Sequence, residues 1–212
     1  MSNLRAAIVP VTAFQQNCTV LFDEVTREAA VVDPGGDVER IVEALEKLKV
    51  VARKIVLTHG HIDHAGGAAA LKRQLDVAIE GPHEADLFLL EDLPASGRKY
   101  GMSDAETVTP DRWLSEGDTV EMAGETFEVY HCPGHSPGSV VLFCRAARFC
   151  QMGDVLFQGS IGRTDFPYGD HEALISAIKT KLLPLGDDVV FIPGHGPAST
   201  LGAERESNPF LQ

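Results

Sequence analysis

The segment that most constrains this chain is residues 58–64, where three histidines and one aspartate directly follow the apolar residues 55–57. Imidazole nitrogens and carboxylate oxygens are ligands that zinc and iron favour in proteins. Helix residues two apart point away from each other, and neighbouring strand residues face opposite sides of a sheet. We therefore expect a loop, for which Gly60 supplies backbone freedom. In such a loop His59 and His61 would reach one ion, and Asp63 and His64 a second.

Four segments of the chain share one pattern, in which an apolar strand is followed by a turn that contains a glycine and a ligand-type residue. The segments are 55–60, 127–135, 149–154 and 189–195, and they bring His59, His135, Asp154 and His195. Pro-Gly-His occurs in two of them, at 133–135 and 193–195. Because sites in α/β proteins usually form at the carboxyl ends of strands, we expect these side chains to meet at one edge of the sheets.

The remaining pattern predicts one α/β domain with a large strand content. We expect strands at 4–11, 18–22, 29–32, 53–57, 77–80 and 189–192, with a mostly β region at 113–157. The residues at 23–28 would close a hairpin. We expect helices at 38–48, 67–75, 83–90 and 171–183, and a loop or lid at 97–110. Asp37 and Asp170 are the expected N-caps, and Pro184 the expected stop of the last helix.

Composition and charge exclude several classes of protein. The 212 residues have 31 acidic and 18 basic side chains, a net charge of -13 that argues against nucleic acid as a partner. The chain has no apolar run long enough to span a membrane and no secretory signal at its N-terminus, so we expect it in the cytoplasm. The four cysteines form no C-x-x-C pair, which favours reduced thiols, although Cys144 and Cys150 could lie on neighbouring strands.

The order T-H-x-H-x-D-H, then a distant His, Asp and His, resembles the metallo-β-lactamase superfamily. The resemblance implies an α/β fold, the αββα sandwich, with two mixed β-sheets flanked by helices and residues 1–212 as one domain. It also implies two divalent metal ions, zinc or iron or both, with manganese also suited. By position, His59, His61 and His135 would hold the first metal, Asp63, His64 and His195 the second, and Asp154 would bridge them.

Three features narrow the branch of the superfamily. Asp154 stands where antibiotic-cleaving members typically have cysteine or serine, and His61 where the oxygen-reducing diiron members have glutamate. The segment 162–166 is similar to the glyoxalase II and persulfide dioxygenase branch. Within that branch, the sequence resembles short bacterial type II glyoxalases most. Conventional glyoxalase II has a C-terminal helical domain, and because few residues follow His195 we expect none here.

The resemblance implies a hydrolase for a small-molecule glutathione thioester. A metal-activated hydroxide, oriented by Asp63 as the catalytic residue, would convert S-D-lactoylglutathione to D-lactate and glutathione. Arg163 and Tyr168 are the expected contacts to the glutathione part.

The same residues are compatible with other activities. The same ligands suit a mononuclear-iron persulfide dioxygenase using His59, His135 and Asp154, or a lactonase, while a non-enzymatic metal-stabilised binding module fits less well. We expect His83, His131 and His171 to stay outside the metal site.

Overall fold

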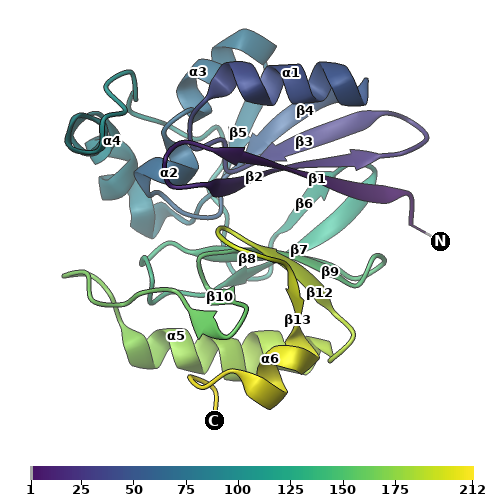
Figure 1. Ribbon diagram of the computed structural model, residues 1–212, viewed down its shortest axis with the longest axis vertical. Helices are drawn as coiled ribbons and strands as arrows, with labels where there is room; N and C mark the ends of the chain where they lie inside the picture. The colour runs from purple at the N-terminus through teal and green to yellow at the C-terminus, as the bar shows by residue number, and fades with distance from the viewer. Residues whose placement is uncertain (1) are drawn as a thin grey trace.

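The computed structural model describes residues 2–212, which form two facing β-sheets with helices on both outer sides (Figure 1). The first sheet has the order β1-β2-β3-β4-β5, antiparallel from β1 to β3 and parallel from β3 to β5. Its strands are β1 (Leu4–Val11), β2 (Gln16–Asp23), β3 (Glu28–Val32), β4 (Val51–Val56) and β5 (Ala78–Glu80). This sheet is therefore mixed, as expected.

The second sheet has the order β13-β12-β9-β8-β7-β6 and is antiparallel except between β9 and β12. Its strands are β6 (Thr119–Met122), β7 (Glu125–His131), β8 (Val140–Cys144), β9 (Phe149–Gly153), β12 (Val190–Pro193) and β13 (Ser199–Thr200). A small hairpin, β10 (Leu156–Phe157) and β11 (Ser160–Ile161), extends beside it.

Helices cover the outer face of each sheet. On the first sheet these are α1 (Val38–Leu48) and α3 (Ala68–Leu75), and on the second α5 (His171–Ala177), its continuation Ile178–Leu182 and Leu183–Leu185, and α6 (Leu201–Ser207). The short α2 (Ile62–Ala65), the turn Glu84–Asp86 and α4 (Leu87–Tyr100) lie at one end of the sandwich (Figure 1). This is the αββα arrangement.

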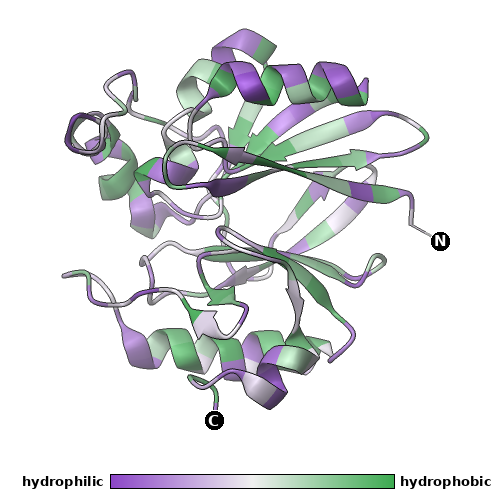
Figure 2. Cartoon of the chain, in the orientation of Figure 1, coloured by the Kyte–Doolittle hydropathy of each residue, from purple (hydrophilic) through white to green (hydrophobic). Residues whose placement is uncertain are grey.

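Both faces of the inner strands are buried, because alternate residues enter different hydrophobic clusters. Val20, Val31 and Ile55 pack under α1 and α3, whereas their neighbours Leu21 and Val56 pack between the two sheets. Figure 2 shows this apolar character along the strands and on the inner sides of the helices. The resulting rigid layers hold the strand ends, and therefore the loops that follow them, in fixed positions.

Most predicted elements are confirmed, including the hairpin of β2 and β3 and the N-cap Asp170, whose carboxylate accepts from Ala173 N at 2.9 Å. Asp37 is the N-cap residue of α1, as predicted, but its side chain makes no cap hydrogen bond and accepts instead from Thr12 N at 2.7 Å. Pro184 does not end the helical run that begins with α5, because this run continues as a 3-10 turn to Leu185. The helix α6 was not predicted.

The prediction of a loop from residue 97 is also wrong, since α4 continues to Tyr100. Pro94 lies inside this helix and has no N–H to donate to the carbonyl of Leu90. That carbonyl accepts from Val108 N at 3.4 Å instead, so the segment after the helix compensates for the proline. A local pattern could not reveal this partner.

Cys144 and Cys150 do lie on neighbouring strands, β8 and β9, as considered from the sequence. Their register places them in different clusters on opposite faces of the sheet, and all four cysteines are free and buried.

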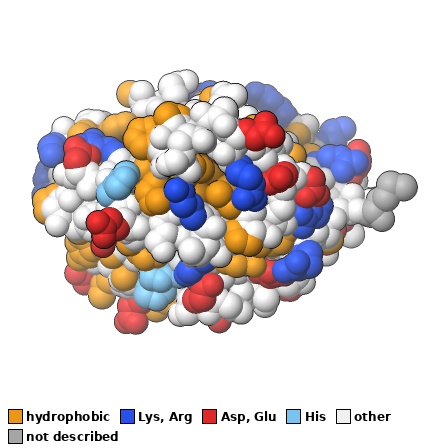
Figure 3. Space-filling model, turned by 90° about the horizontal axis from the view of Figure 1, so that it is seen from below, with side chains coloured by type: hydrophobic (Ala, Val, Ile, Leu, Met, Phe, Trp, Pro, Cys, Tyr) orange, Lys and Arg blue, Asp and Glu red, His pale blue; other side chains and the backbone are white. Residues whose placement is uncertain are grey.

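On the molecular face seen from below, basic side chains are interspersed with acidic and apolar ones (Figure 3).

Within residues 2–212 the helices are too short or too polar to cross a bilayer.

Candidate metal centre

The predicted ligands meet at the end of the sandwich where the strands of both sheets finish. His59 follows β4 of the first sheet, and the expected loop extends only to His61, because Asp63 and His64 lie in the short helix α2 directly after it. His135 follows β7, Asp154 follows β9 and His195 follows β12, all in the second sheet. The structure therefore brings all seven predicted ligands together, four from one layer and three from the other.

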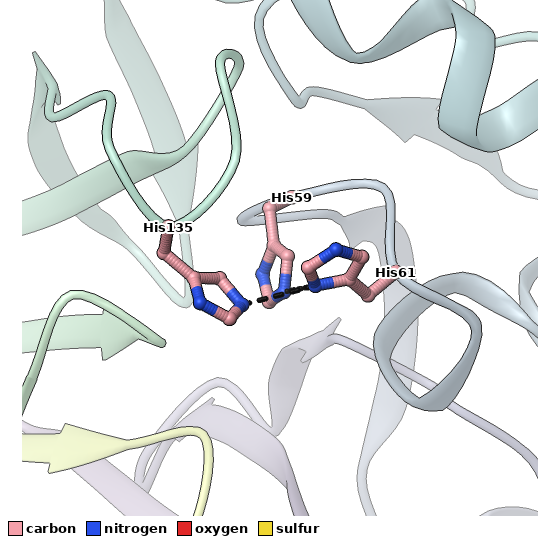
Figure 4. Close-up of side chains that lie close together, drawn as sticks. All are labelled: His59, His61 and His135. Atoms are coloured by element: carbon pink, nitrogen blue, oxygen red, sulfur yellow. Dashed lines mark hydrogen bonds between the residues drawn. The ribbon is translucent and has the colours of Figure 1, made fainter. Parts of the chain in front are cut away.

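The first group consists of three histidines whose ring nitrogens converge (Figure 4). Nδ1 of His61 lies 3.0 Å from Nε2 of His59 and 2.9 Å from Nε2 of His135. The rings stand edge to face, with interplanar angles of 80° to 88°. Three nitrogens pointing at one place form a possible metal site.

The partners of the outer ring nitrogens show which tautomers these histidines adopt. Nδ1 of His135 must donate to the carbonyl of Arg163 at 2.9 Å, which leaves its Nε2 as a bare lone pair. Nδ1 of His59 faces Thr58 Oγ1 at 3.2 Å, and that hydroxyl already donates to Asp33. The inner nitrogens of these two rings are therefore acceptors, and a cation between them would relieve their repulsion.

The second group is Asp63, His64 and His195. Oδ2 of Asp63 lies 3.1 Å from Nε2 of His195 and 3.8 Å from Nε2 of His64. One carboxylate and two imidazoles form a second set of possible ligands beside the first.

Asp154 lies between the two groups and faces both. Its Oδ1 is 3.3 Å from Nε2 of His64, and its Oδ2 is 3.5 Å from Nε2 of His135 and 3.7 Å from Nε2 of His195. A single carboxylate that approaches both groups has the position expected of a bridging ligand.

Two further observations test whether the site suits a cation. Nε2 of His64 and Oδ1 of Asp154 are buried and have no hydrogen-bond partner within residues 2–212. A Cβ at Gly194 would lie 2.1 Å from Oδ1 of Asp154 and 2.5 Å from Cε1 of His64, so only glycine leaves this space open. Buried polar atoms normally have partners, and these residues therefore fit a bound cation.

The charge states of His59, His61 and Asp154 suit metal binding, whereas the neighbouring carboxylates raise the pKa of His64 and of His195 despite their burial. Burial lowers the pKa of His59 well below its usual value and that of His61 to about 3, with the neighbouring histidines adding to both shifts. Burial alone would raise the pKa of Asp154, but the neighbouring histidines, His64 above all, together outweigh burial and lower the pKa. Neutral imidazole and ionised carboxylate are the forms that coordinate metals.

Asp33 also belongs to the site, although it was not among the residues predicted from the sequence. Its carboxylate accepts from Thr58 N at 2.7 Å and from Thr58 Oγ1 at 2.6 Å, and it lies 3.0 Å from Nδ1 of His64. It thereby orients His64 with Nε2 inward. A signal was present, because Asp33 follows a buried strand and precedes Pro-Gly-Gly, which resembles the pattern of the ligands.

Asp86 was also missed, and here the sequence offers no comparable signal. This buried carboxylate accepts from Gly60 N at 2.8 Å, Gly138 N at 2.5 Å and Ser136 Oγ at 2.7 Å. It connects the loop after β4 to the loop that carries His135, and so fixes the distance between ligands of the two layers.

The two predicted substrate contacts occupy different surroundings. The Arg163 guanidinium forms an exposed ion pair with Asp165 at 2.7 Å and lies 4.4 Å from the centre of the Phe166 ring. The hydroxyl of Tyr168 lies 2.8 Å from Nε2 of His61, a contact to a candidate ligand that the sequence analysis did not anticipate. Burial raises the pKa of this tyrosine to about 12.

His83 and His131 stack on each other, with ring centres 4.1 Å apart. Neither they nor His171 belong to the ligand groups found within residues 2–212.

A cleft of about 780 Å³ opens above the ligands. Five of the candidate ligands line this cleft. Side chains from α4 also line it, namely Phe88, Leu89, Asp92, Ser96, Lys99 and Tyr100. The segment from β10 to α5 adds Phe157, Arg163, Phe166 and Tyr168. Aromatic rings and a few charged groups surround an ion site, as in pockets that bind small molecules.

Comparisons with known proteins agree with this geometry. Residues 11–195 match the family model described as the metallo-beta-lactamase superfamily. The chain is 48% identical over 205 residues to a Haemophilus influenzae protein named hydroxyacylglutathione hydrolase GloC, covering 96% of each chain.

Two solved structures resemble this chain in both fold and sequence. The BLEG-1 B3 metallo-beta-lactamase has a TM-score of 0.89 at 38% identity, covering 98% of this chain and 99% of that one. TTHA1623, solved in a di-iron-bound form, has a TM-score of 0.87 at 36% identity, covering 97% of this chain and 100% of that one. With its two sheets, its converging ligands and this match over most of its length, the chain belongs to the metallo-beta-lactamase superfamily.

Proposed function

We propose that the protein hydrolyses a glutathione thioester, with S-D-lactoylglutathione as substrate and D-lactate and glutathione as products. The observation that carries this proposal is the near full-length relationship to the hydroxyacylglutathione hydrolase of Haemophilus influenzae. The seven-residue ligand set supports it, since hydrolysis needs an activated water. The free, buried cysteines support a reducing compartment, and we place the activity in the cytoplasm.

We propose that His59, His61 and His135 hold one divalent ion, that Asp63, His64 and His195 hold another, and that Asp154 bridges them. Zinc, iron and manganese all suit these ligands. Two bound ions would supply a water that is nucleophilic at neutral pH and a Lewis acid for the thioester carbonyl.

The chain's own residues would then orient the reactants. Asp63, whose pKa is lowered by the neighbouring histidines despite its burial, would hold the attacking water through its ionised carboxylate. The water oxygen bonds to the carbonyl carbon and the C–S bond breaks, so the acyl group becomes a carboxylic acid, and the sulfur departs as thiolate and then takes up the proton that the water gave up. A thiolate is a good leaving group, and this mechanism needs no dedicated acid.

The proposal is tested by turnover of S-D-lactoylglutathione with protein of measured metal content. We expect His64→Ala and Asp154→Ala to lose at least about a hundred-fold in activity, because each removes a ligand. His171→Ala, an exposed histidine at the start of α5, is the matched control and should keep wild-type activity. Full activity of Asp154→Ala would contradict the bridging role.

The same preparation distinguishes the other activities. Glutathione persulfide with recorded oxygen uptake tests the dioxygenase, a γ-lactone tests the lactonase, and penicillin G tests the activity named for the BLEG-1 relative. Faster turnover of any of these than of lactoylglutathione would overturn the assignment.

A further inference from the structure

The helix α4 forms one side of the cleft with a regular stripe of side chains. Leu89, Asp92, Ser96 and Lys99 line the cleft, at spacings of three, four and three residues that place them on one helix face. The adjacent face of the helix carries Leu90, Leu93 and Gly97, which are buried. In Figure 1, α4 and the loop that precedes α5 lie on the same side of the molecule, with α4 above the loop.

The stripe carries one negative charge, on Asp92, and one positive charge, on Lys99. Asp92 accepts a hydrogen bond from Ser96 Oγ at 2.8 Å, which orients its carboxylate. Lys99 lies two helical turns further along, about 10 Å away at 1.5 Å per residue. Within residues 2–212 the Lys99 ammonium forms no ion pair, whereas the Arg163 guanidinium in the same cleft is paired with Asp165.

Glutathione carries charges that can pair with both residues. Its γ-glutamyl end has an ammonium group beside an α-carboxylate, and its glycine end has a second carboxylate. A tripeptide in extended form spans about 10 Å between such ends. The cysteine sulfur lies in the middle, where a thioester would point away from a surface that binds both ends.

We propose that the Asp92–Ser96–Lys99 face of α4 binds the peptide part of the glutathione thioester, an inference that rests on the proposed function. Asp92 pairs with the γ-glutamyl ammonium, and Lys99 pairs with the glycine carboxylate. The thioester then faces the ligands below, next to Asp63. The helix thus acts in substrate specificity, and its residues take no part in the chemical step.

The test measures binding of S-methylglutathione, which has a thioether in place of the thioester and cannot be hydrolysed, by isothermal titration calorimetry of the metal-loaded protein. We expect Lys99→Gln to bind about five-fold more weakly than the wild type, as befits loss of one exposed ion pair. Lys47→Gln is the matched control, since Lys47 is also exposed but lies on α1, outside the cleft. It should bind as the wild type does.

A second arm examines Asp92. N-acetylation of S-methylglutathione removes the ammonium charge, so the wild type should prefer the unmodified compound by about five-fold, and Asp92→Asn should lose that preference. Circular dichroism confirms that each variant is folded.

The outcomes separate the two proposals. If the wild type binds S-methylglutathione in this charge-dependent way but does not hydrolyse lactoylglutathione, the proposed function fails and the binding face stands. If the wild type hydrolyses lactoylglutathione while Lys99→Gln and Asp92→Asn bind as the wild type does, the binding face is wrong and the proposed function stands. Absence of measurable binding to the wild type also overturns the binding face.

Discussion

At the scale of single residues, the site depends on which nitrogen of each histidine faces inward. Every ring in the first histidine group has a partner on its outer nitrogen: Thr58 for His59, Tyr168 for His61 and the Arg163 carbonyl for His135. Such outer contacts fix the tautomer and orientation of metal-binding histidines. Thr58, Tyr168 and the Arg163 carbonyl would therefore influence metal binding without touching the metal.

Tyr168→Phe tests this role of an outer contact. Removing the hydroxyl that lies 2.8 Å from Nε2 of His61 should weaken metal binding by about ten-fold, because the ring loses its orienting partner. Competition with a chelating dye measures the affinity. Tyr130→Phe is the control, since the Tyr130 hydroxyl contacts Glu128 and lies outside the cleft. An unchanged metal affinity combined with a raised KM would instead assign Tyr168 to substrate binding alone.

At the scale of elements, α4 shows how a helix can contain sequence signals that predict its end. Pro94 and Gly97 both argue against a continuing helix. The segment after the helix stabilises it, because Val108 N replaces the missing donor to Leu90 and Met102 packs against Gly97. The helix and the segment that follows it therefore form one unit that closes one side of the cleft.

Gly97→Ala tests this packing. Alanine is the better helix former by about 1 kcal/mol, yet its Cβ would lie 2.3 Å from the Met102 carbonyl oxygen, so we expect a net loss of about 1–3 kcal/mol in the free energy of unfolding. Urea denaturation measures this change. Gly101→Ala, at a φ of 78° with open space around it, separates the cost of backbone strain from that of the clash. A Gly97→Ala protein as stable as the wild type would contradict the close packing.

At the scale of the whole molecule, the candidate ligands connect the two layers of the sandwich. Four lie after β4 in the first layer and three follow strands of the second layer, with Asp154 between the groups. Bound metal would therefore add to the contacts that already join the two layers, namely the apolar cluster between the sheets, which includes Phe127 and Leu142, and the hydrogen bonds of Asp86.

Removal of metal should accordingly destabilise the entire fold. A ligand at a hundred times its dissociation constant stabilises a protein by about 2.7 kcal/mol, which corresponds to about 5–10 °C in the melting temperature of a chain of this size. Differential scanning calorimetry with and without a chelator measures the shift. Asp154→Ala, which lacks the central carboxylate, should show a smaller shift. Equal melting temperatures for the loaded and metal-free wild type would contradict a metal that joins the layers.

The sequence by itself determined the ligand types and their places after strands, because the pattern of apolar strand, glycine and ligand is local. It also gave most strands and helices through their alternation, while their ends and α6 depended on contacts that no local pattern contains. The fold class came from the resemblance that these motifs carry, and the comparisons confirm it.

Only the tertiary structure decided which atoms face one another. The contacts of Asp33 with His64, of Asp86 with Gly138 and of Tyr168 with His61 join residues that are 31, 52 and 107 positions apart in the chain. The long extension of α4 along the cleft likewise depends on a backbone donor outside the helix. Such partners are selected by packing of the two layers, and a hydrogen bond between distant residues leaves no periodic trace in the sequence.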